Sequence, residues 1–194
     1  MILVDLKSMR KLVIITLCII FFAGLFTMGY TRLHTETSAT LDEVKYKDYT
    51  GLDGKISYKL PLEWETSEKD FDGEEILYHN DFTSRDKALR GYVQIWNLNM
   101  PLIEFIKRGR ESGIGITTYK YYIIEDVKIN GSDGYILSYS KAKDNNKYTK
   151  AFEVFVLDKA NIFYRFAFYM DESKWKDGYR MYFLNIAASA KIKN

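Results

Sequence analysis

The pattern of apolar and polar positions divides the chain into three parts. Residues 12–31 contain no charged side chain and are rich in Leu, Ile, Val and Phe. A helix of about 20 residues spans roughly 30 Å, the thickness of a bilayer's hydrocarbon core, so we expect a transmembrane signal anchor from Leu12 to Thr31. The polar segment 32–54 is expected to be a tether. Apolar positions recur regularly through residues 55–194, which predicts a folded domain.

Period-two alternation predicts most of the elements in that domain. Its first strand places Ile56, Tyr58 and Leu60 on one face. Turn-forming residues at 130–134 and 158–161 connect neighbouring strands by short links, so these neighbours must pair antiparallel. The predicted strands are residues 55–60, 91–98, 119–129, 135–140, 148–157 and 162–170.

Two segments carry helical periodicity instead. Pro101 suits a first helical position, and Leu102, Phe105 and Ile106 follow at helical spacing. A second helix is predicted over 171–191. The order of strands, helix, four-strand meander and helix predicts an α+β fold, an antiparallel β-sheet packed with helices.

Charged residues around the apolar run set its orientation. Lys7, Arg10 and Lys11 precede the run, so residues 1–11 are expected to stay in the cytoplasm and the C-terminal domain to lie outside the cell membrane. A cleaved signal peptide is the alternative, although no typical small-residue cleavage site follows the run. The prediction is a single-pass membrane protein.

Composition narrows the function classes. Residues 1–32 hold four basic residues and one acidic residue, whereas the whole chain has a net charge of +2, which leaves the outer part at −1. The basic character therefore comes from the anchor, and no nucleic-acid binding is expected. The chain has 1 Cys and 2 His, so an internal disulfide is excluded and neither a cofactor nor a metal is expected.

The segment between Glu63 and Glu75 is strongly acidic, and we expect it to be a solvated loop. It contains a weak cation-binding candidate at Asp70, Asp72 and Glu74. An EF-hand starting at Asp70 would need Gly at its sixth position and Glu at its twelfth, and Glu75 and Asp81 stand there instead.

Basic residues in the middle of the chain form a candidate interaction surface. Such a surface would suit anionic lipid headgroups or an acidic partner, although a solvated helix face would explain part of it. The residues are Arg85, Lys87, Arg90, Lys107, Arg108 and Arg110.

No catalytic residue is predicted. His79 lies beside Asp81, but no nucleophile motif accompanies them. Carboxylate pairs between Glu63 and Asp81 leave a hydrolase open as an alternative. Arg165, within an apolar strand, is expected to face solvent; if it were buried it would need an acidic partner.

Several segments resemble the PsbP-like superfamily. These are the opening strand 56–64 (ISYKLPLEW), the hairpins through 134–135 (GY) and 161–166 (NIFYRF), and the helix end 186–189 (IAAS). The resemblance covers about residues 50–194. It implies an extracytoplasmic α/β/α sandwich with a binding or assembly role and no shared catalytic residues.

We therefore predict a membrane-anchored extracytoplasmic binding or assembly module of a bacterial cell envelope, without catalysis and with an envelope protein as partner. The alternatives are the carboxylate-based hydrolase and a small-ligand or lipid-binding sensor. The sensor alternative predicts a sizeable pocket in the sandwich.

Overall fold

The computed structural model describes residues 44–192 except 114–115, 144–146 and 160. The predicted cytoplasmic segment 1–11 and the predicted anchor 12–31 lie outside the described residues, as does most of the predicted tether. In the part of the chain that is described, neither α-helix has the length and apolarity needed to cross a membrane.

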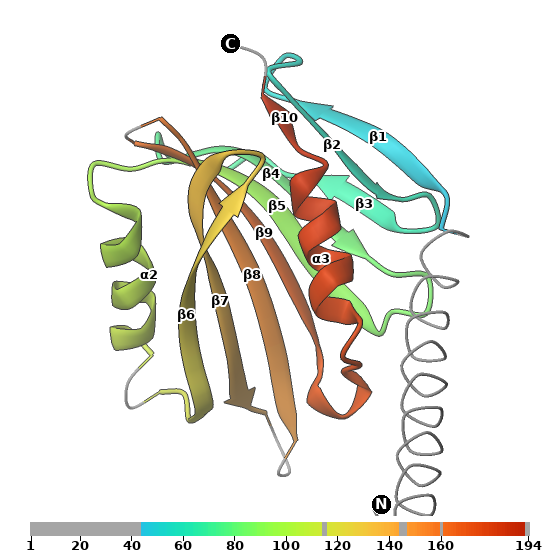
Figure 1. Cartoon of the computed structure of the whole chain (residues 1–194), viewed down its shortest axis with the longest axis vertical. Coiled ribbons are helices and arrows are strands. Elements are labelled where there is room, and N and C mark those ends of the chain that lie inside the picture. Colours follow the sequence, from blue (N-terminus) through green and yellow to red (C-terminus); the bar gives the residue numbers. More distant parts are fainter. Residues whose placement is uncertain (1–43, 114–115, 144–146, 160, 193–194) are drawn as a thin grey trace, which may run out of the picture. The chain divides into compact units, whose positions relative to one another are not determined.

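Ten strands and two α-helices make up the described chain (Figure 1). The larger sheet contains β3 (Glu65–Glu68), β4 (Ile76–Thr83), β5 (Leu89–Asn97), β6 (Tyr119–Ile129), β7 (Ser132–Ala142), β8 (Tyr148–Lys159) and β9 (Ile162–Asp171). The smaller sheet contains β1 (Tyr46–Gly51), β2 (Ile56–Pro61) and β10 (Lys191–Ile192). The helices are α2 (Leu102–Glu111), the 3-10 turn η1 (Glu172–Lys174) and α3 (Tyr179–Ala188).

The larger sheet has seven strands in the order β3-β4-β5-β9-β8-β7-β6, and all neighbours are antiparallel. Strands β6 to β9 follow one another as the predicted meander. Strand β9 then pairs with β5, so that the middle of the sheet is built from segments far apart in the sequence. The smaller sheet has the order β1-β2-β10.

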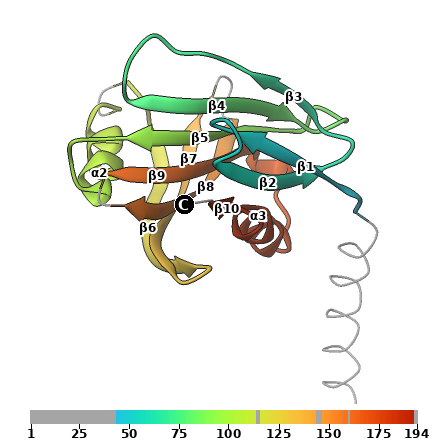
Figure 2. The same cartoon turned by 90° about the horizontal axis from the view of Figure 1, so that it is seen from above.

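The two faces of the larger sheet are covered differently. Leu102 and Ile106 of α2 pack with Phe155 and Phe163 on one face. On the other face, α3 and the smaller sheet enclose the larger of the two apolar clusters. Seen from above, α2 and α3 lie well apart with strands of the sheet between them (Figure 2). The α+β sandwich predicted from the sequence is confirmed.

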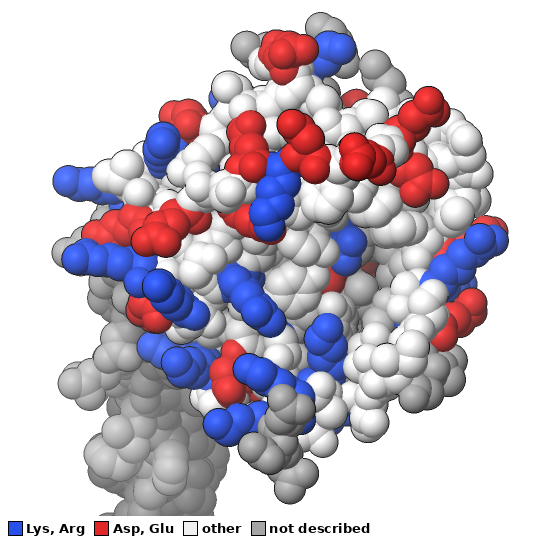
Figure 3. All heavy atoms as spheres, turned by 180° about the vertical axis from the view of Figure 1, so that it is seen from behind, with Lys and Arg blue, Asp and Glu red and all other residues white. Residues whose placement is uncertain are grey.

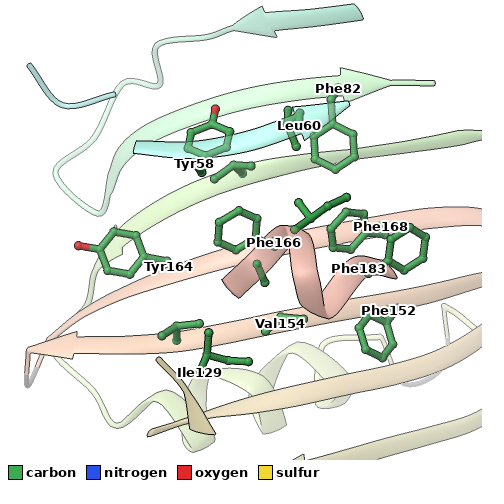
Figure 4. Packing of buried hydrophobic residues seen from close by; sticks show 14 of the residues in the cluster. Tyr58, Leu60, Phe82, Ile129, Phe152, Val154, Tyr164, Phe166, Phe168 and Phe183 are labelled. Carbon is green, nitrogen blue, oxygen red and sulfur yellow. The ribbon is translucent and has the colours of Figure 1, made fainter. Parts of the chain in front are cut away.

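Stacked aromatic rings hold α3 on the sheet (Figure 4). Phe183 has no exposed surface, and its ring lies 4.2 Å from that of Phe168 at an interplanar angle of 9°. Phe152 and Phe166 extend the same cluster along the central strands. Burying these rings stabilises the fold because each removes a large apolar area from water.

The β6–β7 hairpin turns through Asn130 and Gly131, a tighter turn than the predicted 130–134. Both residues have positive φ values, 52° and 86°, as in the two-residue turn that Asn-Gly favours. The Asn130 side chain donates hydrogen bonds to the carbonyl oxygens of Ala188 and Ala190, at 2.8 and 3.3 Å. One residue thus shapes the turn and also satisfies carbonyl groups at the end of α3.

The single C-terminal helix predicted over 171–191 is wrong. Asp171 ends β9, and its side chain accepts from the backbone of Ser173, which starts the short turn η1 rather than a long helix. The backbone is extended again at Trp175, and α3 begins only at Tyr179. The last residues form β10 because β2 has a free edge that they pair with, Lys191 opposite Ser57.

Order also begins earlier than expected. Strand β1 falls within the predicted tether 32–54, and it pairs with β2 along its whole length. The ring of Tyr49 stacks on Tyr58 at 5.7 Å, which gives an otherwise polar segment an apolar contact with the core. Strands β3 and β4 also lie outside the predicted set, because β3 has no large apolar residue and the buried polar residues His79 and Asn80 interrupt the apolar alternation of β4.

Replacing Phe183 by Ala is expected to lower the free energy of unfolding by about 3–5 kcal/mol, because it opens a cavity between α3 and the sheet. Met181, on the same helix, has 54% of its surface exposed and provides the control. Met181→Ala should change stability by less than about 0.5 kcal/mol. Urea unfolding of both variants followed by circular dichroism checks this, and equal effects would contradict the assigned packing.

Candidate functional site

The predicted basic surface is divided between two elements. Arg85, Lys87 and Arg90 lie in the β4–β5 turn and at the start of β5, whereas Lys107, Arg108 and Arg110 lie on α2. All six side chains are exposed. Arg85 has an acidic neighbour within the domain, because its guanidinium lies 3.6 Å from the carboxylate of Glu63, the first residue of the acidic stretch.

The three acidic residues of the cation-binding candidate lie in one exposed loop. Asp70, Asp72 and Glu74 are all exposed, in the loop before β4. Among the residues that the structure describes, no three His, Cys, Asp or Glu side chains come together as metal ligands would. The prediction of a mainly solvated loop describes this segment better, although residues 65–68 within it form edge strand β3.

The acidic loop 70–75 and the basic turn lie at opposite ends of β4, whereas Glu63 and Glu65 of the acidic stretch lie beside the turn. The acidic loop precedes Ile76 and the basic turn follows Thr83, so about 25 Å of strand separates them. Viewed from the side opposite α3, Asp and Glu predominate over the upper part of the surface and Lys and Arg over the lower part (Figure 3). This side of the domain therefore has a strong charge gradient.

Between the two charged ends lies a band of polar and aromatic side chains. They project from β4, β5, β8 and β9 on the same side of the sheet as α2 and lie beside that helix. We call this surface the polar face. Its residues are His79, Asp81, Arg90, Tyr92, Gln94, Trp96, Glu153, Arg165 and Tyr169.

A buried ion pair forms the centre of the polar face. Glu153 has no exposed surface, and one of its oxygens accepts from both Nε and Nη2 of Arg165, at 2.8 and 2.7 Å. Its other oxygen accepts from the hydroxyls of Tyr139 and Tyr169, at 3.1 and 2.8 Å. Four donors thus compensate the buried carboxylate, as its desolvation requires.

Arg165 contradicts the prediction of a solvent-facing residue. Only 18% of its side chain is exposed, and the guanidinium lies over the rings of Tyr92 and Phe155, at 5.1 and 5.3 Å. Burial acts to lower the pKa of Arg165, but the Glu153 carboxylate outweighs this and raises it above the ordinary value. The alternative stated from the sequence, a buried arginine with an acidic partner, is the one that the structure has.

Burial dominates the titration of the neighbouring phenols. It raises the pKa of Tyr92 to about 12, and it raises the pKa of Tyr169 well above its ordinary value, with the Glu153 charge adding to the effect. Both hydroxyls therefore keep their protons at neutral pH. They act as hydrogen-bond donors, with Tyr92 and Tyr169 also 3.0 Å from each other.

A second chain of hydrogen bonds crosses β4 and β5. The indole N–H of Trp96 donates to the amide oxygen of Gln94, so the amide nitrogen of Gln94 faces Nδ1 of His79, at 2.8 Å. Nδ1 must then accept, and Nε2–H donates to Asp81 at 2.7 Å. Lys69 completes the chain on the other carboxylate oxygen of Asp81.

These contacts leave no free catalytic group at His79. Both ring nitrogens are occupied, and no serine in the described part of the chain hydrogen-bonds to the ring. Two of the carboxylates between Glu63 and Asp81 are also engaged, since Glu68 accepts from Tyr78 and Asp81 accepts from Lys69 and His79. These hydrogen bonds hold the His79 ring and the Asp81 carboxylate in fixed orientations.

A small hollow of about 140 Å³ adjoins the polar face where α2 meets the sheet. Phe105 and Gly109 of α2 form one wall, and Tyr122, Glu153 and Arg165 form part of the rest. The hollow is below the usual size of a site for drug-sized ligands. It gives the ion pair limited access to solvent.

The acidic partner of Arg165 at the centre of the polar face is not predicted from the sequence. Glu153 was not singled out, although it is the one charged residue among the apolar positions 151–157, and Arg165 occupies the same situation in 162–170. The two strands form a tight hairpin, so opposite charges on one face fall diagonally across it. That pairing signal could have identified both.

No protein-family model and no curated protein sequence matches this chain. Among solved structures, it is similar to cyanobacterial PsbP from Synechocystis, with a TM-score of 0.57 and 14% identity over 77% of this chain and 94% of that one. The chain therefore has a PsbP-like fold. At this identity the likeness concerns the fold and carries no site residue.

A protein of unknown function from Pseudomonas aeruginosa is also similar, at 10% identity over 66% of this chain and 84% of that one. Its TM-score of 0.38 is too low to support an argument.

Replacing Glu153 by Gln is expected to destabilise the domain by about 3–5 kcal/mol, because Arg165 would keep a buried charge without a counter-ion. The double variant E153M/R165M should recover most of this loss, since it removes both charges. As control, Asp133→Asn breaks an exposed pair with Lys128 and should cost less than about 1 kcal/mol. Urea unfolding measures all three, and an E153Q effect no larger than that of D133N would refute the pairing.

The pH dependence of stability should report on Asp81. Partial burial acts to raise the pKa of Asp81, but hydrogen bonds from Lys69 and His79 lower it below its ordinary value of 3.8. The resulting stabilisation is present above the pKa of the unfolded carboxyl and is lost as the pH falls through the folded value. Asp81→Asn should therefore flatten the fall in melting temperature below about pH 4. An unchanged slope would contradict this assignment.

Proposed function

We propose that this chain is a membrane-anchored extracytoplasmic binding or assembly module and that it acts without catalysis. The observation that carries the proposal is the polar face, a pre-organised aromatic and ionic surface between two zones of opposite charge. The uncharged run 12–31 in the sequence supports the anchor, and the basic residues before it support an N-terminus in the cytoplasm.

The composition of the polar face favours a protein partner. Tyr, Trp and Arg are the residues that contribute most energy in protein interfaces. Tyr92, Trp96, Arg165 and Tyr169 are each partly exposed there, and hydrogen bonds and stacking already fix their positions. A partner that binds such a surface loses little side-chain entropy.

The charge gradient specifies the chemistry of that partner. A complementary surface carries basic groups opposite the acidic loop before β4 and acidic groups opposite the basic turn after it. Such an arrangement sets orientation as well as attraction, because the reversed pose places like charges together. We propose that the partner is another protein of the cell envelope.

Site-directed photo-cross-linking in the native membrane tests this function. A photoreactive phenylalanine analogue replaces Phe71, whose exposed ring lies 4.9 Å from that of His79 at the edge of the polar face. The same analogue at Met181, exposed on α3, is the control. We expect one discrete heterologous adduct from position 71 and none from position 181.

Reversing charge at the basic turn should weaken that adduct. The triple variant R85E/K87E/R90E is expected to reduce its yield about tenfold, because it removes attraction and adds repulsion. The control variant K128E/K191E changes exposed lysines of β6 and β10, away from the basic turn, and should leave the yield unchanged. Absence of any adduct at position 71, or equal loss in both variants, would overturn the proposal.

A further inference from the structure

A second concave site lies on the opposite face of the sheet from the polar face. It is a groove of about 490 Å³ between strands β6–β8 and the segment that joins η1 to α3. Lys150 and Tyr121 come from the sheet, and Trp175 and Arg180 come from the C-terminal segment. Its volume lies within the range of small-molecule sites.

Lys150 is a partly buried cation that no acidic side chain neutralises directly. No Asp or Glu oxygen of the described residues lies within ion-pair distance of it. Its ammonium lies 4.0 Å from the centre of the Trp175 ring, which stabilises the charge only in part. Burial lowers the pKa of Lys150, which reflects this incomplete compensation.

Two hydroxyl groups next to Lys150 are also unsatisfied. Tyr121, Ser140 and Lys150 occupy one row across β6, β7 and β8, so their side chains share a face. The hydroxyl oxygens of Tyr121 and Ser140 are buried and have no hydrogen-bond partner within the described chain. Buried hydroxyls are normally paired. Tyr121 lines the groove, so its hydroxyl is available to an acceptor that the described residues do not supply.

The remaining charges of the groove limit the charge of a ligand. Arg180 forms a bidentate salt bridge with Glu125, in which its two terminal nitrogens donate to the two carboxylate oxygens at 2.9 and 3.2 Å. Lys150 is thus the cation available, while Glu125 and Asp177 at the groove would repel a dianion. Ile123, with 50% of its surface exposed, and Phe152 provide an apolar area for the rest of the ligand.

We propose that this groove binds a small organic monocarboxylate with a compact apolar body. Its carboxylate pairs with the Lys150 ammonium and accepts from the Tyr121 hydroxyl, and its body lies against Ile123 and Phe152. The site uses none of the residues of the polar face. Its failure and the failure of the proposed partner binding are therefore distinguishable.

Titration calorimetry with benzoate tests the proposal on the purified full chain. Benzoate has one negative charge and an apolar ring, and benzamide is its neutral counterpart of the same shape. We expect saturable binding of benzoate and binding of benzamide that is at least about tenfold weaker, because the amide loses the charge-assisted bond to Lys150. Equal affinity for the two probes, or no saturable binding of benzoate, would overturn the assignment.

Variants locate the binding in the groove. Lys150→Met removes the charge but keeps an unbranched apolar chain, and it should weaken benzoate binding at least about tenfold. Lys176→Met, an exposed lysine in the same segment as Trp175, should bind like the wild type. If K150M does not fold, Tyr121→Phe replaces it and should weaken binding severalfold. Full affinity in K150M, or in Y121F where that variant stands in, would refute the site.

Discussion

Strands β8 and β9 lie in the middle of the seven-stranded sheet, and helices pack over part of each face. A polar side chain that is buried in these strands must therefore find a partner inside the protein. Most positions meet this constraint by being apolar, as in the stack of Phe168 on Phe183. Glu153 and Arg165 meet it by pairing with each other. The tyrosines around them then follow as a consequence, because a carboxylate with no exposed surface needs more donors than one guanidinium supplies to a single oxygen.

This constraint also explains where the polar face ends. Helix α2 is only ten residues long and covers the strands next to it, leaving the area over β4 and β5 without a covering layer. Apolar side chains there would form an exposed apolar patch, which favours aggregation. Aromatic residues with polar ends and a hydrogen-bonded His79 produce instead a surface that is ordered yet compatible with water.

The sequence predicts those elements whose apolar periodicity is regular along the local sequence. Strands β2, β5 and β6 to β9 alternate regularly, and α2 begins where Pro101 indicates, because local sequence alone specifies each. Elements that depend on distant partners were missed. Strand β10 is stabilised by pairing with the edge of β2, and β1 is stabilised in part by the stacking of Tyr49 on Tyr58. The acidic residues of β3 disguise a strand whose position at the edge of the sheet tolerates exposed charge.

The same distinction separates the predicted site residues from those that the structure brings together. Clusters of charged residues can be recognised in the sequence, so Arg85, Lys87 and Arg90 were predicted to form a surface. Their separation from the acidic loop could not be predicted without strand β4, which lies between the two. Buried charge is harder to recognise, since Arg165 in an apolar strand has the same local pattern whether it faces water or an acid. Whether Arg165 is exposed or buried depends on which elements cover its face of the sheet, and that depends on the arrangement of the whole sheet. Unsatisfied groups such as Lys150 and the Tyr121 hydroxyl are the hardest to predict from the sequence. They are recognised only by the absence of a hydrogen-bond or ion-pair partner among the described residues, and this requires the complete fold.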